Sequence, residues 1–512
     1  MGGVAISGQV DALDATESRA VYARLVLGQA VLLGLLGDAL LRTPPWGIGW
    51  TIWVATLSTT IILLVQRRGE RLTLEQRAWL GVGLACAAAF AWRDAGELQL
   101  LNFWATLCAL AMLAMSLARV PARSILSARL RDVFLAWRYS VQDALGGVVP
   151  LWSRDAAMGA AIQRSAGGRT PILRAALLTL PLLIVFGALL SSADPVFSSL
   201  FELPDIGLEQ VASHLLVAGA FAWVSAGWLR GALIAGEHRA AAPDRLPFAL
   251  GIVEISAALG ALNALFAIFV GLQVRWLFGG ADIVRETTGL SLAEYARRGF
   301  FELVMVSALV FPLILGTRAA VAGDPRALKR HTTLALPLLG LLPAIMLSAV
   351  LRMRLYVLNF GLTTDRVYAL VFMLWLALAF LCMALTVLRG WARPFAILIT
   401  VSAYVTLFAL NAANPEAIVA RLNLARSPTT RALDYRYLAS LSGDAAPIVA
   451  AAIASGPPSA GACKAAARLH GRWSKGLTDN MQWNVGAARA RVMVLERLTP
   501  HSLRRLCASS RT

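Results

Sequence analysis

Long apolar runs alternate with short polar stretches rich in arginine along most of this chain. Buried helices of soluble domains are usually shorter and amphipathic, whereas runs of about 18 or more apolar residues are typical of transmembrane helices. The pattern predicts about eleven membrane spans, at 22–41, 48–65, 78–92, 99–117, 173–191, 211–234, 247–271, 301–317, 333–351, 367–388 and 395–411. The third run is short, and a re-entrant segment is the alternative for it.

The charges of the loops predict how these spans are oriented. Arginines are concentrated in the loops 66–77, 118–172 and 318–330, whereas the stretch 192–210 contains acids and no base. Loops rich in arginine and lysine remain in the cytoplasm. We therefore expect the N-terminus inside the cell and, with an odd number of spans, the C-terminus outside.

The predicted spans divide the chain into successive regions. These are a cytoplasmic segment at 1–21, four transmembrane helices at 22–117, a cytoplasmic arginine-rich linker at 118–172, seven transmembrane helices at 173–411 and a helical tail outside the membrane at 412–512. The predicted fold class is all-α, a polytopic transmembrane helical bundle with a small helical C-terminal extramembrane tail. No apolar segment precedes the first span, so we expect no cleaved signal peptide.

The linker contains a segment, 125–139, with apolar residues on one helical face and arginines on the other. This pattern is typical of a helix that lies on an anionic membrane surface. A helix packed under the bundle is the alternative. Anionic lipids are therefore an expected partner of the arginine-rich linker.

The composition agrees with a membrane protein, because 58% of the residues are hydrophobic and only 15% are charged. The net charge of +18 is also found in nucleic-acid-binding proteins. Here the charge lies in the loops and no basic-aromatic motif is present, so we expect no nucleic-acid partner. The chain contains no phosphate loop, HExxH or GxSxG motif, and we expect no cofactor.

The cysteines do not form a metal-binding pattern. Cys86, Cys108 and Cys382 fall inside apolar runs, and no CxxC or Cys/His cluster occurs, so we expect no metal site. Cys463 and Cys507 lie in the tail. In an oxidising exterior compartment they could form a disulfide, although two unpaired thiols are the simpler interpretation.

Several short segments in the second half of the chain together resemble one group of proteins. They are Ser191–Phe197, Glu294–Leu303, Leu351–Tyr356, Gly361–Leu370, Asn414–Pro415, Ala420–Arg426, Asp434–Leu438 and Asp444–Pro447. This set resembles bacterial multi-pass membrane proteins grouped as "domain of unknown function 4173", which are related to the similar 4153 group. The resemblance covers roughly 170–450. It implies a bacterial inner-membrane location and no settled activity.

Ionisable residues inside predicted spans are candidates for function, because a charge at the centre of a spanning helix costs at least about 2.5–3.5 kcal/mol. Glu254 is the acid that the spans place deepest, as a ligand for a proton or cation or as half of a structural pair. Asp38 lies near the outer end of the first span, where headgroup water is the simpler environment.

The predicted exterior turn between the ninth and tenth spans is basic, although exterior loops are usually poor in arginine. It contains Arg352, Arg354, Asp365 and Arg366. The expected acidic partners are Asp365 itself and, on the same side, Asp194 and Glu302. An ion-pair network between helix ends is favoured here over a site for an anionic ligand.

These features support a non-enzymatic sensing or scaffold component of a membrane complex, because a bare transporter does not need the tail. The tail would then bind a protein partner. A secondary transporter that uses Glu254 is one alternative. A membrane enzyme that acts on lipid or envelope polymer at the exterior arginines is the other.

Overall fold

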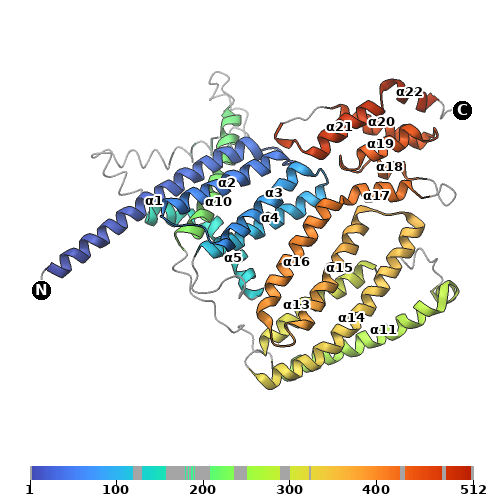
Figure 1. The fold of residues 1–512 in the computed structure, drawn as a ribbon, viewed down its shortest axis with the longest axis horizontal. Coiled ribbons are helices and arrows are strands. Elements are labelled where there is room, and N and C mark those ends of the chain that lie inside the picture. Colours follow the sequence, from blue (N-terminus) through green and yellow to red (C-terminus); the bar gives the residue numbers. More distant parts are fainter. Residues whose placement is uncertain are drawn as a thin grey trace.

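The computed structural model describes residues 3–118, 130–156, 208–235, 251–288, 300–321, 324–426, 433–475 and 480–508, with isolated positions at 179, 183, 186–187 and 190. All regular secondary structure in these residues is helical (Figure 1). The predicted all-α fold class is therefore confirmed.

The N-terminal half of the bundle surrounds one apolar core, whose fully buried side chains include Leu33, Ile61 and Leu113. It is formed by α1 (Gly3–Leu41), α2 (Ile48–Arg67), α3 (Leu74–Trp92), α4 (Gly96–Leu117), α5 (Leu130–Gly146), α6 (Val148–Pro150), the π-helical turn η2 (Leu151–Asp155) and α10 (Leu208–Leu233). A capping box starts α3, because Thr73 and Gln76 each bind the backbone N–H of the other.

The second half of the bundle surrounds a separate core that includes Leu338, Leu342 and Phe395. It is formed by α11 (Ile252–Thr288), α13 (Phe300–Ala320), α14 (Pro325–Phe360), α15 (Thr364–Leu385) and α16 (Ala392–Ala413).

Helix α16 joins the two halves. Phe395 lies in the second core, whereas Tyr404 lies in the first and donates a hydrogen bond to the carbonyl of Ala105 at 2.9 Å. About one turn away in α4 and two turns away in α16, the amides of Asn102 and Asn411 donate to each other at 3.0 and 3.2 Å. Reciprocal amide bonds of this kind satisfy polar groups between membrane helices.

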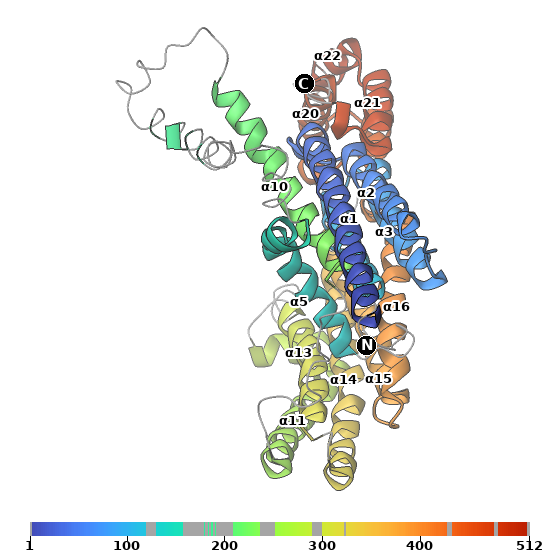
Figure 2. The ribbon, with the colours of Figure 1, turned by 90° about the vertical axis from the view of Figure 1, so that its left-hand side faces the viewer.

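The tail folds on a third core, which includes Val449, Ala466 and Leu469. It is formed by α17 (Pro415–Leu424), α18 (Tyr435–Leu438), α19 (Ala446–Ser455), α20 (Ala460–Ser474), the short 3₁₀ turn η4 (Asn480–Gln482), α21 (Val485–Arg497) and α22 (Pro500–Ala508). Cys463 of α20 and Cys507 of α22 are joined by a disulfide, with their Cα atoms 5.1 Å apart. Figure 2 shows the tail helices at one end of the bundle, which we call the tail end.

Nine helices of the described residues are long and apolar enough to cross a membrane, namely Ser18–Leu41, Ile48–Arg67, Gly96–Leu117, Glu209–Leu233, Ile252–Gln273, Phe300–Ala320, Pro325–Leu358, Thr364–Leu385 and Pro394–Ala413. The predicted span 78–92 is not among the nine; it is the apolar part of α3, whose first turn is charged. The predicted span 173–191 lies mostly outside the described residues. The number of spans and their orientation stay predictions.

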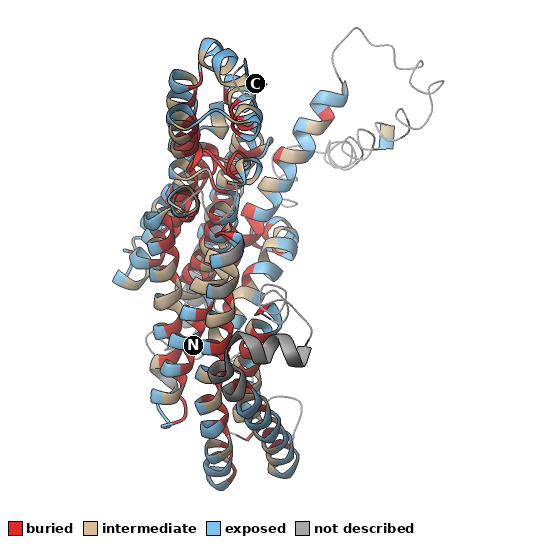
Figure 3. Cartoon of the chain, turned by 90° about the vertical axis from the view of Figure 1, so that its right-hand side faces the viewer, coloured by how far each residue is buried: buried red, intermediate tan, exposed pale blue. Residues whose placement is uncertain are grey.

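Burial agrees with a helical bundle surrounded by lipid. Buried residues face the interior of the bundle, and exposed residues cover its outer faces (Figure 3). Several of the exposed residues are large and apolar, among them Leu374, which is 73% exposed, and Leu265, which is 59% exposed. Such faces are unfavourable in water and are expected in hydrocarbon.

The described part of the linker, α5, packs against α4 and α10. Trp137 donates its indole N–H to the sulfur of Cys108 in α4 at 3.1 Å, and Trp223 of α10 donates to the carbonyl of Leu145 at 2.8 Å. Over Leu130–Gly146 the linker is therefore a helix packed on the bundle, the alternative that the amphipathic pattern left open. The predicted segment before Leu130 lies outside the described residues.

Helices α1 and α10 approach each other closely through small residues. A Cβ atom at Gly34 would lie 2.5 Å from the carbonyl oxygen of Ala218 and 2.5 Å from the Cβ of Ala222. Small residues allow this approach between membrane helices, as in other small-residue interfaces.

We predict that Gly34→Leu separates α1 from α10 and destabilises the protein by about 1–3 kcal/mol, the usual cost of overpacking. The measurement is the melting temperature of the purified protein in detergent. Gly28→Leu is the matched control, because nothing lies within 4 Å of a Cβ atom at that position of the same helix. Equal melting temperatures for the two variants would contradict the predicted contact.

Candidate functional site

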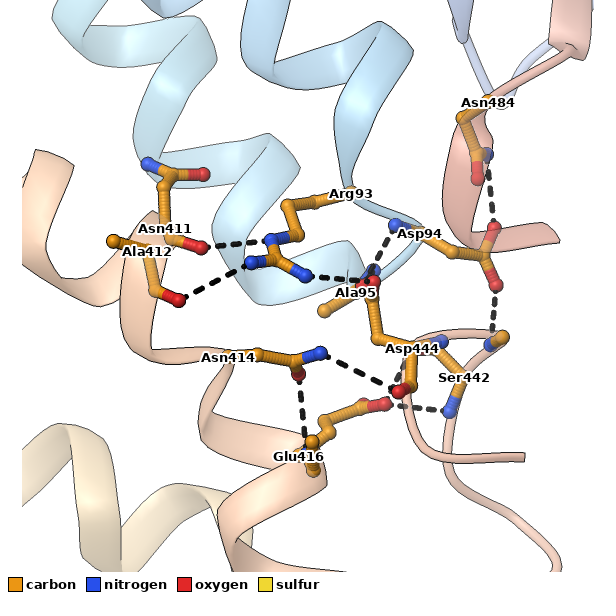
Figure 4. Close-up of polar contacts among 12 residues, drawn as sticks. Arg93, Asp94, Ala95, Asn411, Ala412, Asn414, Glu416, Ser442, Asp444 and Asn484 are labelled. Carbon is orange, nitrogen blue, oxygen red and sulfur yellow. Dashed lines mark hydrogen bonds and ion pairs between the residues drawn. The ribbon is translucent and has the colours of Figure 1, made fainter. Parts of the chain in front are cut away.

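Asp444 connects the tail to the N-terminal half of the bundle at the tail end. Its buried carboxylate accepts the backbone N–H groups of Asp94 and Ala95 at 2.8 and 2.9 Å (Figure 4). It also pairs with the guanidinium of Arg93 at 3.4 Å. The same arginine donates to the carbonyl of Asn411 at 2.7 Å. The loop between α3 and α4 is thus bound to both α16 and the tail.

Asp94 makes the reverse connection. Its carboxylate accepts the backbone N–H of Gly443 at 2.6 Å and the side-chain amide of Asn484 at 3.0 Å. The loop of Asp94 and the loop of Asp444 therefore each provide a carboxylate that binds backbone N–H groups of the other loop. The two loops approach each other closely. A Cβ atom at Gly443 would lie only 2.9 Å from Oδ2 of Asp94. A larger residue at position 443 would clash with these atoms, so the position requires glycine.

Glu416 is a third buried carboxylate at this junction. It accepts the backbone N–H of Ser442 at 2.7 Å and a short hydrogen bond from the hydroxyl of the same serine. Its place at the start of α17 is set by Asn414, whose φ of 56° ends α16 and whose side chain accepts the N–H of Ala417. Pro415 at the first helical position completes this corner.

Burial raises the pKa of Glu416 from its usual 4.5 to about 7, although the hydrogen bonds from Ser442 act in the opposite direction. The negative charges of Glu97 and Asp444 add to the rise. The pKa of Asp444 is also raised by burial, against its bonds to Ala95 and Asp94. The junction therefore contains one carboxyl group, that of Glu416, whose charge depends on pH near neutrality.

The tail also clamps the turn between α14 and α15. Asn423 accepts the N–H of Leu362 at 2.8 Å and donates to the carbonyl of the same residue at 2.7 Å. The N–H of Thr364, the first residue of α15, donates to the hydroxyl of Tyr437 at 3.0 Å. Gly361 has a φ of 85°, which favours glycine. The start of α15 is therefore held by the tail.

A cavity of about 970 Å³ lies between the two halves of the bundle, bounded by residues of α4, α5, α13, α15 and α16. Its lining is mostly apolar, with Leu101, Phe311 and Leu407 as examples. The charged lining residues are Glu97 and Asp365 in the first turns of α4 and α15, at the tail end. The cavity is an apolar space with two acids at its tail end, which we call its mouth.

The predicted basic turn is not a loop for most of its length. Helix α14 continues to Phe360, so Arg352 and Arg354 lie inside it and the turn is only Gly361–Thr363. Arg366 donates to the carbonyl of Gly361 and lies 4.2 Å from the centre of the Tyr356 ring. Arg366 is thus bound within the turn that it follows.

The ion-pair network expected among these arginines and acids stays a prediction. Asp365 is exposed beside Arg366, and Glu302 is exposed in the first turn of α13. Asp194 lies outside the described residues. The structure therefore places Asp365 at the cavity mouth, a position that the sequence did not indicate.

Asp38 lies in a small polar cluster between α1 and α10. Its carboxylate contacts Nδ1 of His214 at 2.5 Å and a guanidinium nitrogen of Arg42 at 2.7 Å, and Arg42 also donates to Ser213. Glu254 is exposed in the first turn of α11. The helix starts at Ile252, so this acid is at the end of its helix and not one turn inside it.

The residues of the junction were missed by the analysis of the sequence, although part of the signal was there. Asn414–Pro415 and Asp444–Pro447 belong to the segments that carried the family resemblance. Asp94 stands out only as an acid between two spans. Nothing local links it to Asp444, because 350 positions separate them.

A family model described as "Domain of unknown function (DUF4153)" matches residues 80–452. The chain belongs to this family. The matching region of this DUF4153 protein runs from α3 into the tail, so it starts well before the segments that the sequence resemblance covered. The related 4173 group is not the matching model, although its type is the same. No curated protein and no solved structure matches the chain.

We predict that Asp444→Ala releases the tail from the bundle, because it leaves two backbone N–H groups without an acceptor and Arg93 without its anionic partner. Breaking a buried pair from one side costs about 3–5 kcal/mol. Hydrogen exchange should then increase in α19 to α21, whereas Glu496→Ala, on an exposed position of α21, should leave it unchanged. Unaltered exchange in the Asp444 variant would contradict this role.

Stability should also depend on pH through Glu416. Because its pKa is about 7 in the folded protein and 4.5 ordinarily, the folded state binds the proton more tightly. Its contribution is present at low pH and declines as pH rises between these values. We expect the melting temperature to fall more steeply with rising pH in the native protein than in Glu416→Gln, which cannot titrate. Identical slopes would show that Glu416 is not the group responsible.

Proposed function

We propose that this protein is a non-enzymatic component of the bacterial inner membrane that binds a lipid-like amphiphile between its two halves. The tail would report occupancy of the cavity and contact a partner protein. Anionic lipids would contact the arginine-rich linker. This develops the sensing or scaffold hypothesis that the tail suggested.

One observation carries the proposal, namely that the cavity and the tail share the first turns of α15. Thr364 is bonded to Tyr437 of the tail, whereas Asp365 and Tyr368 line the cavity. A ligand that moves this turn would therefore act directly on a contact of the tail. The negative charges of Glu97 and Glu416 are close enough to act on Tyr368.

The lining indicates the chemistry of the ligand. Along α4 the cavity extends from Glu97 to Met112, which is about 22 Å at 1.5 Å per residue. This is most of the hydrocarbon thickness of about 30 Å, so an extended alkyl chain matches the apolar part. Glu97 and Asp365 at the mouth favour an amine or another cationic group on the head of the ligand.

The alternative functions are less well supported. Glu254 lies exposed at the start of α11, which removes the main reason to propose a transporter. An enzyme at the arginines would need a free acid or nucleophile beside them. Asp365 is an exposed acid beside Arg366, but the guanidinium of Arg366 is itself bound to Gly361 and Tyr356 within the turn.

The test is a photo-reactive amino acid placed in the cavity of the full-length protein in its own membrane. At Ala403, which lines the cavity, we expect covalent capture of an amine-bearing lipid species at several times its share of bulk lipid. Leu374 is the matched control, because it lies on the outer surface of α15 and should capture lipids in bulk proportions. Mass spectrometry of the adducts is the measurement.

The double variant Glu97→Gln/Asp365→Asn examines the mouth separately. It should abolish the preference for an amine headgroup while adducts still form at Ala403. The same lipid mixture at Ala403 and Leu374, or an adduct of Ala403 to another part of the chain, would overturn the proposal.

A further inference from the structure

A second, smaller cavity lies at the end of the bundle opposite the tail. Its volume is about 400 Å³, and it is bounded by the ends of α2, α4 and α10 and by the part of α1 where the apolar segment Ser18–Leu41 begins. Leu117, Leu233 and Ile234 form an apolar wall, and Arg19, Arg67 and Arg68 provide positive charge. This cavity, which we call the basic pocket, combines the two properties of a phospholipid site.

Two of the three arginines of the basic pocket, Arg19 and Arg68, are held in place by the fold. Arg68 lies 4.4 Å from the centre of the Tyr22 ring and donates to the carbonyl of Leu233, which ties α2 to α1 and α10. Arg19 pairs with Oδ1 of the buried Asp155 at 3.1 Å. Side chains held in this way lose little freedom when a ligand binds.

Positive charge is left over at this end. Asp155 is shared between Arg19 and Arg230, which pairs with its other oxygen at 2.6 Å, so this trio retains one positive charge. Glu70 is the single acid that lines the pocket, and its negative charge offsets part of the positive charge of Arg67 and Arg68. Arg67 is exposed and makes no hydrogen bond or ion pair with any residue that the structure describes.

We propose that the basic pocket binds the phosphate of an anionic phospholipid. The guanidinium of Arg67 would contact the phosphate oxygens, with Arg19 and Arg68 beside it. Basic pockets between the ends of transmembrane helices are suited to phosphate headgroups.

A lipid is favoured over free phosphate by the position and the walls of the pocket. The pocket lies where α2, α4 and α10 end and the candidate span of α1 begins, at the level of lipid headgroups if these helices cross the membrane. Its apolar wall would contact the glycerol and the start of the acyl chains. Free phosphate has no apolar surface that such a wall could bury. The site is separate from the larger cavity, so the two proposals fail or stand independently.

The experiment compares Arg67→Gln with Arg71→Gln in the full-length protein in detergent. Arg71 is an exposed arginine of the same loop that does not line the pocket. Native mass spectrometry measures the retention of added phosphatidylglycerol, with phosphatidylcholine as the neutral lipid. We expect a loss of about fivefold in affinity for phosphatidylglycerol in Arg67→Gln, the usual effect of one arginine at an anionic surface. Arg71→Gln should bind like the native protein.

Equal retention by both variants, or no preference for phosphatidylglycerol in the native protein, would overturn the proposal. Inorganic phosphate is added as a competitor at the concentration of the lipid. Displacement of the lipid by phosphate would show a site for free phosphate and reject the lipid. A melting temperature of Arg67→Gln equal to that of the native protein shows that lost binding is not lost folding.

Discussion

The buried carboxylate of Asp444 is the contact on which the arrangement of the tail depends. It accepts two backbone N–H groups of the loop between α3 and α4 and pairs with Arg93. A buried charge is tolerated only when its hydrogen-bonding capacity is used, and three donors converge on this one. Without it the tail core and the bundle would face each other with unpaired polar groups.

The same principle recurs at the other contacts of the tail. Asn423 binds both backbone groups of Leu362, and Tyr437 accepts the N–H of Thr364. These bonds attach the tail to the second half of the bundle, while Asp444 attaches it to the first. The tail therefore contacts both walls of the larger cavity near its mouth. A change in the spacing of the halves would reach the tail through polar contacts whose geometry is specific.

Most of the fold could be predicted from the sequence. The all-α class followed from the apolar runs, and the helices observed around 48–67, 96–117 and 364–385 lie close to the predicted ones. The errors concern helix ends. Helix α14 runs to Phe360 because no proline or glycine lies between Pro343 and Gly361, so residues expected in a loop are helical. Hydropathy reports where a helix enters hydrocarbon and not where it ends.

The candidate site was predicted only in fragments. Asp365 was chosen as an ion-pair partner, and its place in the lining of the large cavity was not foreseen, while Glu254 and Asp38 lie near helix ends. Asp94, Glu416 and Asp444 were not chosen, because an acid outside a span is usually solvated and no local pattern distinguishes these three.

The sequence by itself determined the helices and their lipid-exposed character, because a chain in hydrocarbon must satisfy its backbone hydrogen bonds within each segment, and long apolar runs do so as helices. The tertiary structure alone decided which polar groups meet. Asp94 and Asp444 are 350 positions apart along the chain, and their contact depends on the packing of α3, α16 and the tail together. The cavities have the same origin, since each is bounded by helices from distant parts of the chain.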